Sequence, residues 1–66
     1  MTRMQAWGRV ERTKTAAIED ATDAFGRLVA ETRRTQIGWL RYDEVRPTPT
    51  GFQARVSART RPRRER

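Results

Sequence analysis

Four side chains in the second half of the chain have the chemistry to bind a planar ligand that carries negative charge. They are Trp39, Arg46, Gln53 and Arg55. An indole ring stacks on other aromatic ring systems, and a carboxamide both donates and accepts hydrogen bonds at the edge of a heterocycle. A guanidinium group binds phosphate. We take these four residues as the candidate binding site.

Each of these residues also has a plainer interpretation. Trp39 could pack into a subunit interface or be an ordinary, partly exposed aromatic residue. Arg41 and Arg55, taken singly, are more typical of solvated charge on a sheet surface. The position of Trp7 relative to Trp39 stays open at this level.

Catalysis by the chain alone is not expected, because it contains no Cys and no His. Thiol nucleophiles, imidazole bases and the usual zinc sites are therefore excluded. No calcium-loop motif is present either. A binding or structural role is the remaining class, and we predict that the protein is not an enzyme.

The elements that position the candidate site follow from changes in hydrophobic period. Residues 4–12 alternate and predict a strand, with Met4 and Ala6 on one side and Trp7 on the other. Within it, Gly8 indicates a weak point or a close approach of backbone. Residues 15–34 have a helical period, and Thr13 or Thr15 is the expected N-cap. The apolar stripe comprises Ile18, Ala21, Phe25, Leu28, Val29 and Thr32, and Gly26 is interpreted as a close helix contact.

The period returns to two in the second half of the chain. Residues 37–46 and 52–60 predict two strands of a hairpin, joined by a Pro- and Gly-containing turn over 46–51. One face of the sheet then carries Leu40 and Tyr42 with Phe52, Ala54 and Val56, and should pack against the helix. The opposite face carries Trp39, Gln53 and Arg55.

We therefore predict an α+β fold, a β-α-β-β protomer with an antiparallel sheet and one helix on one face. Residues 1–60 form the domain and residues 61–66 a basic, disordered tail. A chain of 66 residues buries a small core. Without disulfides or a metal, a chain with so small a core is expected to gain stability by self-association, with neighbouring copies covering the other face of the sheet.

Charge and hydropathy narrow the partners and the cellular location to be expected for the protein. The net charge is +7, and residues 59–66 contain five arginines and one glutamate. Such an Arg-rich tail is a candidate for contact with nucleic acid by counterion release. No apolar run approaches the roughly 20 residues that span a bilayer, and no signal peptide is recognisable. A cytoplasmic protein without a membrane partner is expected.

Several short motifs, in their order and spacing, resemble the dodecins, a family of small flavin-binding proteins. The motifs are Ile18-Glu19-Asp20-Ala21, Ile37-Gly38-Trp39, Arg46 seven residues after that Trp, and Phe52-Gln53. The resemblance covers about residues 5–60. It implies a β-α-β-β protomer, assembly into a homo-oligomer of twelve copies, and storage of flavin without turnover.

The resemblance also implies roles for individual residues. Trp39 matches the tryptophan that stacks on the flavin ring, and Gln53 matches the glutamine at the polar edge of that ring. Arg46 matches an arginine associated with nucleotide ligands at subunit contacts, and Arg55 is expected to assist it. The implied cofactor is a flavin, either FMN, riboflavin or FAD.

Two other functions remain open from the residues. A structural or adaptor homo-oligomer without a small ligand would use Trp7 and Trp39 as interface residues. A small nucleic-acid-binding module would lay the sheet face and the Arg-rich tail along a phosphate backbone.

Overall fold

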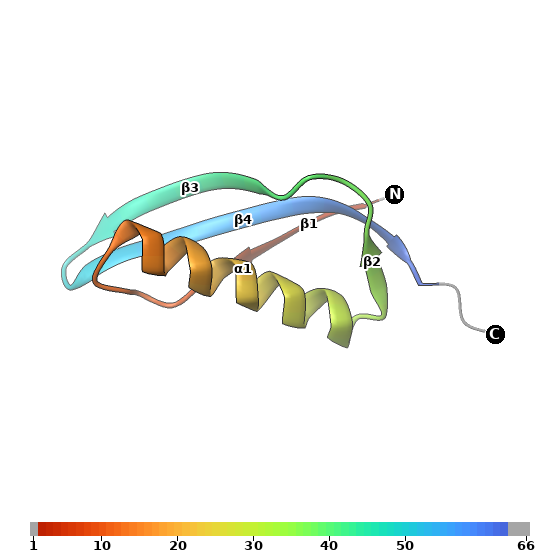
Figure 1. Cartoon of the computed structure of the whole chain (residues 1–66), viewed down its shortest axis with the longest axis horizontal. Coiled ribbons are helices and arrows are strands. Elements are labelled where there is room, and N and C mark those ends of the chain that lie inside the picture. Colours follow the sequence, from red (N-terminus) through yellow and green to blue (C-terminus); the bar gives the residue numbers. More distant parts are fainter. Residues whose placement is uncertain (1, 64–66) are drawn as a thin grey trace.

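In the computed structural model, which describes residues 2–63, one long helix lies across one face of an antiparallel sheet (Figure 1). This arrangement confirms the predicted α+β class with a single helix on the sheet. The elements, in chain order, are β1 (Thr2–Trp7), α1 (Lys14–Glu31), β2 (Arg34–Gln36), β3 (Arg41–Thr48) and β4 (Gly51–Pro62).

Strand β4 is the centre of the sheet. One edge of β4 pairs with β1, from Thr2 opposite Thr60 to Trp7 opposite Arg55. Its other edge pairs with β2 and then with β3, placed end to end along the same strand. β4 continues through Pro62, beyond the predicted end at residue 60, and residues 64–66 of the predicted tail lie outside the described chain.

The predicted strand over residues 37–46 is wrong in its extent. The structure divides this edge into β2 and β3, separated by residues 37–40. Ile37 still donates its backbone N–H to the Arg59 carbonyl at 3.0 Å, after which the ladder is interrupted. Gly38 contributes to this interruption, because glycine weakens a strand interior. β3 then runs on through Pro47, which an edge strand tolerates because its outward side needs no N–H donor.

Helix α1 begins and packs largely as its sequence predicts. Thr13 is the N-cap, and its Oγ1 accepts a hydrogen bond from the Ala16 N–H at 3.1 Å. Phe25 is buried against the helix-facing residues of β4, while Ile18 and Val29 are partly buried. Ala17, which the predicted stripe omitted, is fully buried, because the line of closest contact follows i, i+4 and i+8 spacing. The core comprises Ala17, Ala21, Phe25, Ala54, Val56 and Ala58.

The prediction that Tyr42 packs beneath the helix is wrong, because the side chain is 61% exposed. A β-bulge lies between Tyr42 and Glu44, where the register against β4 shifts. An extra residue in one strand reverses the alternation beyond it. Val45 therefore points toward the core, and Arg46 lies on the opposite face.

The two glycines singled out in the sequence have different environments. A Cβ atom on Gly8 would lie 2.6 Å from the backbone nitrogen of Ala21, so the close approach predicted there is confirmed. A Cβ atom on Gly26 would meet nothing within 4 Å, so the predicted helix contact at Gly26 is wrong. No helix within residues 2–63 is long and apolar enough to cross a membrane.

Candidate functional site

The face of the sheet opposite α1, which we call the outer face, carries most of the polar side chains of interest. Cross-strand partners share a face, so the register assigns the residues directly. Ser57 lies between Gln5 of β1 and Arg41 of β3, and Arg55 lies between Trp7 of β1 and Glu44 of β3. The outer face carries Arg3, Gln5, Trp7, Thr35, Arg41, Glu44, Arg46, Gln53, Arg55, Ser57, Arg59 and Arg61.

Three of the four predicted site residues gather around Trp7. The Arg46 guanidinium lies 4.4 Å from the centroid of the Trp7 ring, and that of Arg55 lies 5.5 Å away. Arg46 also donates a hydrogen bond to Gln53 Oε1 at 2.8 Å. Such guanidinium–indole contacts contribute about 0.5–1 kcal/mol each at exposed sites. We call Trp7, Arg46, Gln53 and Arg55 the Trp7 cluster.

The amide of Gln53 is occupied within its own chain. Its Nε2 donates to the Gly8 carbonyl at 3.0 Å, and its Oε1 accepts from Arg46. Gln53 therefore joins β4 to the residues that follow β1 and holds the Arg46 side chain over the outer face. These two contacts leave one lone pair of Oε1 and one hydrogen of Nε2 for a ligand.

Trp39 is not part of this cluster. It lies in the segment between β2 and β3, beyond the end of β3 that pairs Arg41 with Ser57. Arg46 pairs with Gln53, so four residues of β4, or about 13 Å, separate the two ends. The structure thus separates Trp39 from Arg46, Gln53 and Arg55 within one chain.

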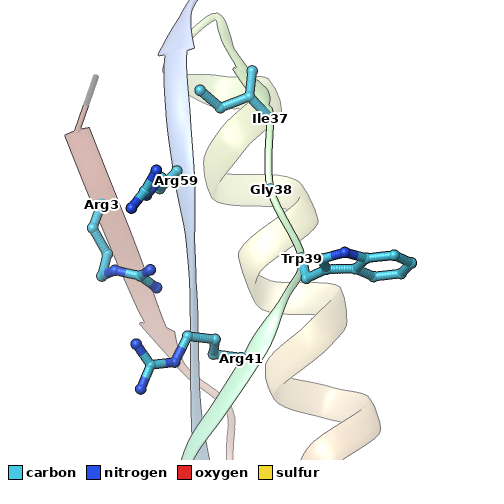
Figure 2. Close-up of a pocket in the computed structure, with 6 residues that line it drawn as sticks. All are labelled: Arg3, Ile37, Gly38, Trp39, Arg41 and Arg59. Atoms are coloured by element: carbon cyan, nitrogen blue, oxygen red, sulfur yellow. The ribbon is translucent and has the colours of Figure 1, made fainter.

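The surroundings of Trp39 form a second candidate site. Its side chain is 93% exposed and projects away from the sheet (Figure 2). An open cavity of about 350 Å³ is lined by Arg3, Ile37, Gly38, Trp39, Arg41 and Arg59. A second, more open hollow of about 580 Å³ is lined by Gln36, Ile37, Gly38 and Trp39.

The first cavity is rich in guanidinium groups. The side chains of Arg3, Arg41 and Arg59 lie on the side of the β3 backbone away from the indole (Figure 2). Arg3 donates a hydrogen bond to the Ser57 hydroxyl at 3.0 Å, and Arg41 lies 3.8 Å from an Asp43 carboxylate oxygen. Sequence reasoning did not select either Arg3 or Arg59 as a site residue. Alternation placed Arg59 on the outer face, whereas Arg3 precedes the predicted strand over residues 4–12.

The arrangement can stack on a ring and hold an anion. Within residues 2–63, no group of three or more Asp or Glu side chains is placed to hold a metal ion. Comparison with protein-family models, with curated proteins and with solved structures found no match to the chain.

Proposed function

We propose that the protein is a non-catalytic homo-oligomer that binds a flavin on Trp39 and keeps it out of solution in the cytoplasm. The observation that carries this proposal is the 93% exposure of the Trp39 side chain. Burying a large apolar side chain stabilises a protein by about 1.5–3 kcal/mol. A small domain that leaves an indole this exposed gains that energy when a ligand or a neighbouring copy covers the ring.

The space beside Trp39 suits a flat ring system. Ligand cavities commonly measure about 300–1,000 Å³, and the hollows at Trp39 measure about 350 and 580 Å³. An isoalloxazine ring stacked on the indole would gain both apolar contact and favourable ring geometry. Arg3, Arg41 and Arg59 line the first hollow and would attract the phosphate of FMN or FAD.

The Trp7 cluster enters this proposal through neighbouring copies. Gln53 and Arg46 lie about 13 Å along β4 from the Trp39 end, and Arg55 lies about 7 Å from it, so one chain does not place all three beside the Trp39 ring. A neighbouring copy supplies them, so that assembly completes the site. The resemblance to the dodecins supports this arrangement, in which paired flavins lie between tryptophans of different copies in a particle of twelve.

Flavin fluorescence tests the proposal. Adding the protein to FMN should quench the flavin emission, because the excited ring accepts an electron from the stacked indole. Trp39→Ala should abolish the quenching, whereas Trp7→Phe should retain it, because Trp7 is held by two guanidinium groups instead. Quenching that persists in Trp39→Ala would exclude the stacking role of Trp39. If the native protein does not change the flavin emission, flavin binding is excluded altogether.

A further inference from the structure

The outer face has a strong excess of positive charge. The register places six arginines and one acidic residue, Glu44, on this face. Glu44 lies 3.9 Å from Arg55, and Asp43 in the bulge lies 3.8 Å from Arg41, so four of the six arginines have no carboxylate partner within residues 2–63. Along β4, alternate side chains stand about 6.7 Å apart, so the charges form an extended row. We call the six residues the arginine row, which comprises Arg3, Arg41, Arg46, Arg55, Arg59 and Arg61.

The arginine row is unfavourable for the isolated chain. Arg3 and Arg59 are direct cross-strand partners, and like charges in that position destabilise a sheet. Arg61 is the next outward residue on β4. Within residues 2–63, no ion pair joins Arg3, Arg59 or Arg61 to a carboxylate. A bound anion would supply the missing counter-charge and relieve this repulsion.

A second copy of the outer face is a poor occupant. The sequence analysis expected neighbouring copies to cover this face, but face-to-face contact would oppose two arginine rows. Desolvating like charges against each other is costly. The occupant of the face must instead carry repeated negative charge.

The distance between the two ends of the arginine row distinguishes among possible anionic partners. A compact phosphate compound would reach either Arg3 and Arg59 or the Trp7 cluster, but not both ends of the row. A lipid surface would need a broad apolar patch beside the charges, whereas Gln5 and Gln53 lie among them and Trp7 is in contact with Arg46 and Arg55. A linear polyanion contacts the whole row, and Trp39, which borders the cavity of Arg3 and Arg59, offers a ring for a base.

We propose that the outer face binds a single strand of nucleic acid along β4. The phosphates lie on the arginine row, and one base stacks on Trp39. This inference goes beyond flavin binding and does not depend on it, because the arginine row and not the indole supplies most of the affinity. Single-stranded nucleic acids bind in this way through a basic groove and aromatic rings.

The direct test is the binding of a fluorescent oligothymidylate of about 12 nucleotides to the full chain, followed by anisotropy. Two double variants lose the same charge. Arg41→Ala with Arg59→Ala shortens the arginine row, whereas Arg12→Ala with Arg27→Ala removes exposed cations from the loop before α1 and from α1 itself. The C-terminal tail is unchanged in both, so its contribution cancels.

The expected result is an affinity that falls linearly with salt on logarithmic axes. The Arg41/Arg59 variant should bind about tenfold more weakly at low salt, with a salt slope smaller by about 1.4. The Arg12/Arg27 variant should bind like the native chain. Equal weakening of both variants, or no binding by the native chain at about 50 mM salt, would overturn the proposal.

Two further measurements separate the alternative polyanions. Trp39→Ala should weaken oligothymidylate binding without changing the salt slope, because stacking releases no counterions. If Trp39→Ala has no effect and inorganic polyphosphate binds as tightly as the oligonucleotide, the partner is not a nucleic acid. Binding to phosphatidylserine vesicles without binding to oligothymidylate would also overturn the proposal. Circular dichroism will show whether each variant is folded. If the Arg41→Ala, Arg59→Ala variant is unfolded, Arg41→Gln with Arg59→Gln replaces it in the test.

Discussion

Two tryptophans of this short chain have opposite environments, and their difference defines the two candidate sites. The guanidinium groups of Arg46 and Arg55 lie 4.4 Å and 5.5 Å from the centroid of the Trp7 ring, while Trp39 is 93% exposed. A stacked guanidinium occupies one ring face, so Trp7 has a structural role that the chain satisfies by itself. Trp39 has no such partner in the described chain and is the ring that remains open to a ligand.

Asp20 is the residue at which pH should most clearly affect the fold. The Arg9 backbone N–H donates a hydrogen bond to the Asp20 carboxylate, and the Arg9 guanidinium lies 3.4 Å from it. The backbone hydrogen bond is the main cause that lowers the pKa of Asp20 below its usual value of 3.8, and it outweighs the opposing effect of burial. A lowered pKa means that the carboxylate stabilises the folded state in its charged form.

Asp20→Asn should therefore remove a stabilisation that is pH-dependent. In the native chain this contribution is fully present above pH 3.8 and is lost as the pH falls through the lower pKa of the folded state. Urea midpoints measured between about pH 5 and pH 2.5 should fall less steeply in Asp20→Asn than in the native protein. Asp23→Asn removes the same charge from an exposed part of α1 and reports the effect of net charge alone. An equal decline in the native chain and in Asp20→Asn would contradict the assignment.

At the scale of elements, the central strand β4 organises the molecule. It pairs with all three other strands, and its helix-facing residues Ala54, Val56 and Ala58 are buried against α1. Small side chains on both surfaces permit close packing of the helix on the sheet. The connection after β1 is equally tight, because Gly8 lies against the backbone of α1 at Ala21.

The same substitution at two glycines should have opposite effects on stability. Gly8→Ala would force Cβ to within 2.6 Å of the Ala21 nitrogen, and such overpacking costs about 1–3 kcal/mol. Gly26→Ala adds a methyl group in open space on a helix, which should stabilise the fold by about 0.8–1 kcal/mol. Thermal or urea unfolding of the two variants measures both changes. Destabilisation by Gly26→Ala would show that this position has a contact that the isolated chain lacks.

At the scale of the whole molecule, the sheet leaves two edges unpaired within the described chain. One is β1, and the other is formed by β2 and β3. The second edge also carries exposed apolar side chains, with Ile37 at 38%, Trp39 at 93% and Tyr42 at 61%. An unpaired edge with exposed apolar residues is a natural surface for association. We therefore expect copies to meet along the β2–β3 edge and not with two outer faces packed against each other.

Mass in solution tests where the copies meet. The native chain should be several times heavier than its 7.7 kDa monomer in light scattering. Tyr42→Lys should reduce the mass, because it adds a charge at the β2–β3 edge, whereas Gln5→Lys adds the same charge on the outer face and should leave the mass unchanged. The opposite pattern would place the interface on the outer face. A stable assembly that does not bind flavin would favour the alternative function named in the sequence analysis, a structural homo-oligomer without a small ligand.

The sequence by itself determined the helix, the strand that becomes β4, and the apolar side of each of these two elements. The alternation from Phe52 to Thr60 and the helical spacing of Ala21 and Phe25 are local patterns, and local periodicity decides which side of an element is apolar. Even the separation of Gln53 and Arg55 from the buried face follows from it. These features could be predicted because each depends on residues that are neighbours in the chain.

The tertiary structure alone decided how distant segments are aligned. The bulge between Tyr42 and Glu44 and the break over residues 37–40 arise where an edge strand pairs with β4, and a shift of one residue reverses every later side chain. Register also separated Trp39 from Gln53 and placed Arg3 opposite Arg59. Such pairings depend on contacts between residues far apart in the chain, which no local pattern encodes.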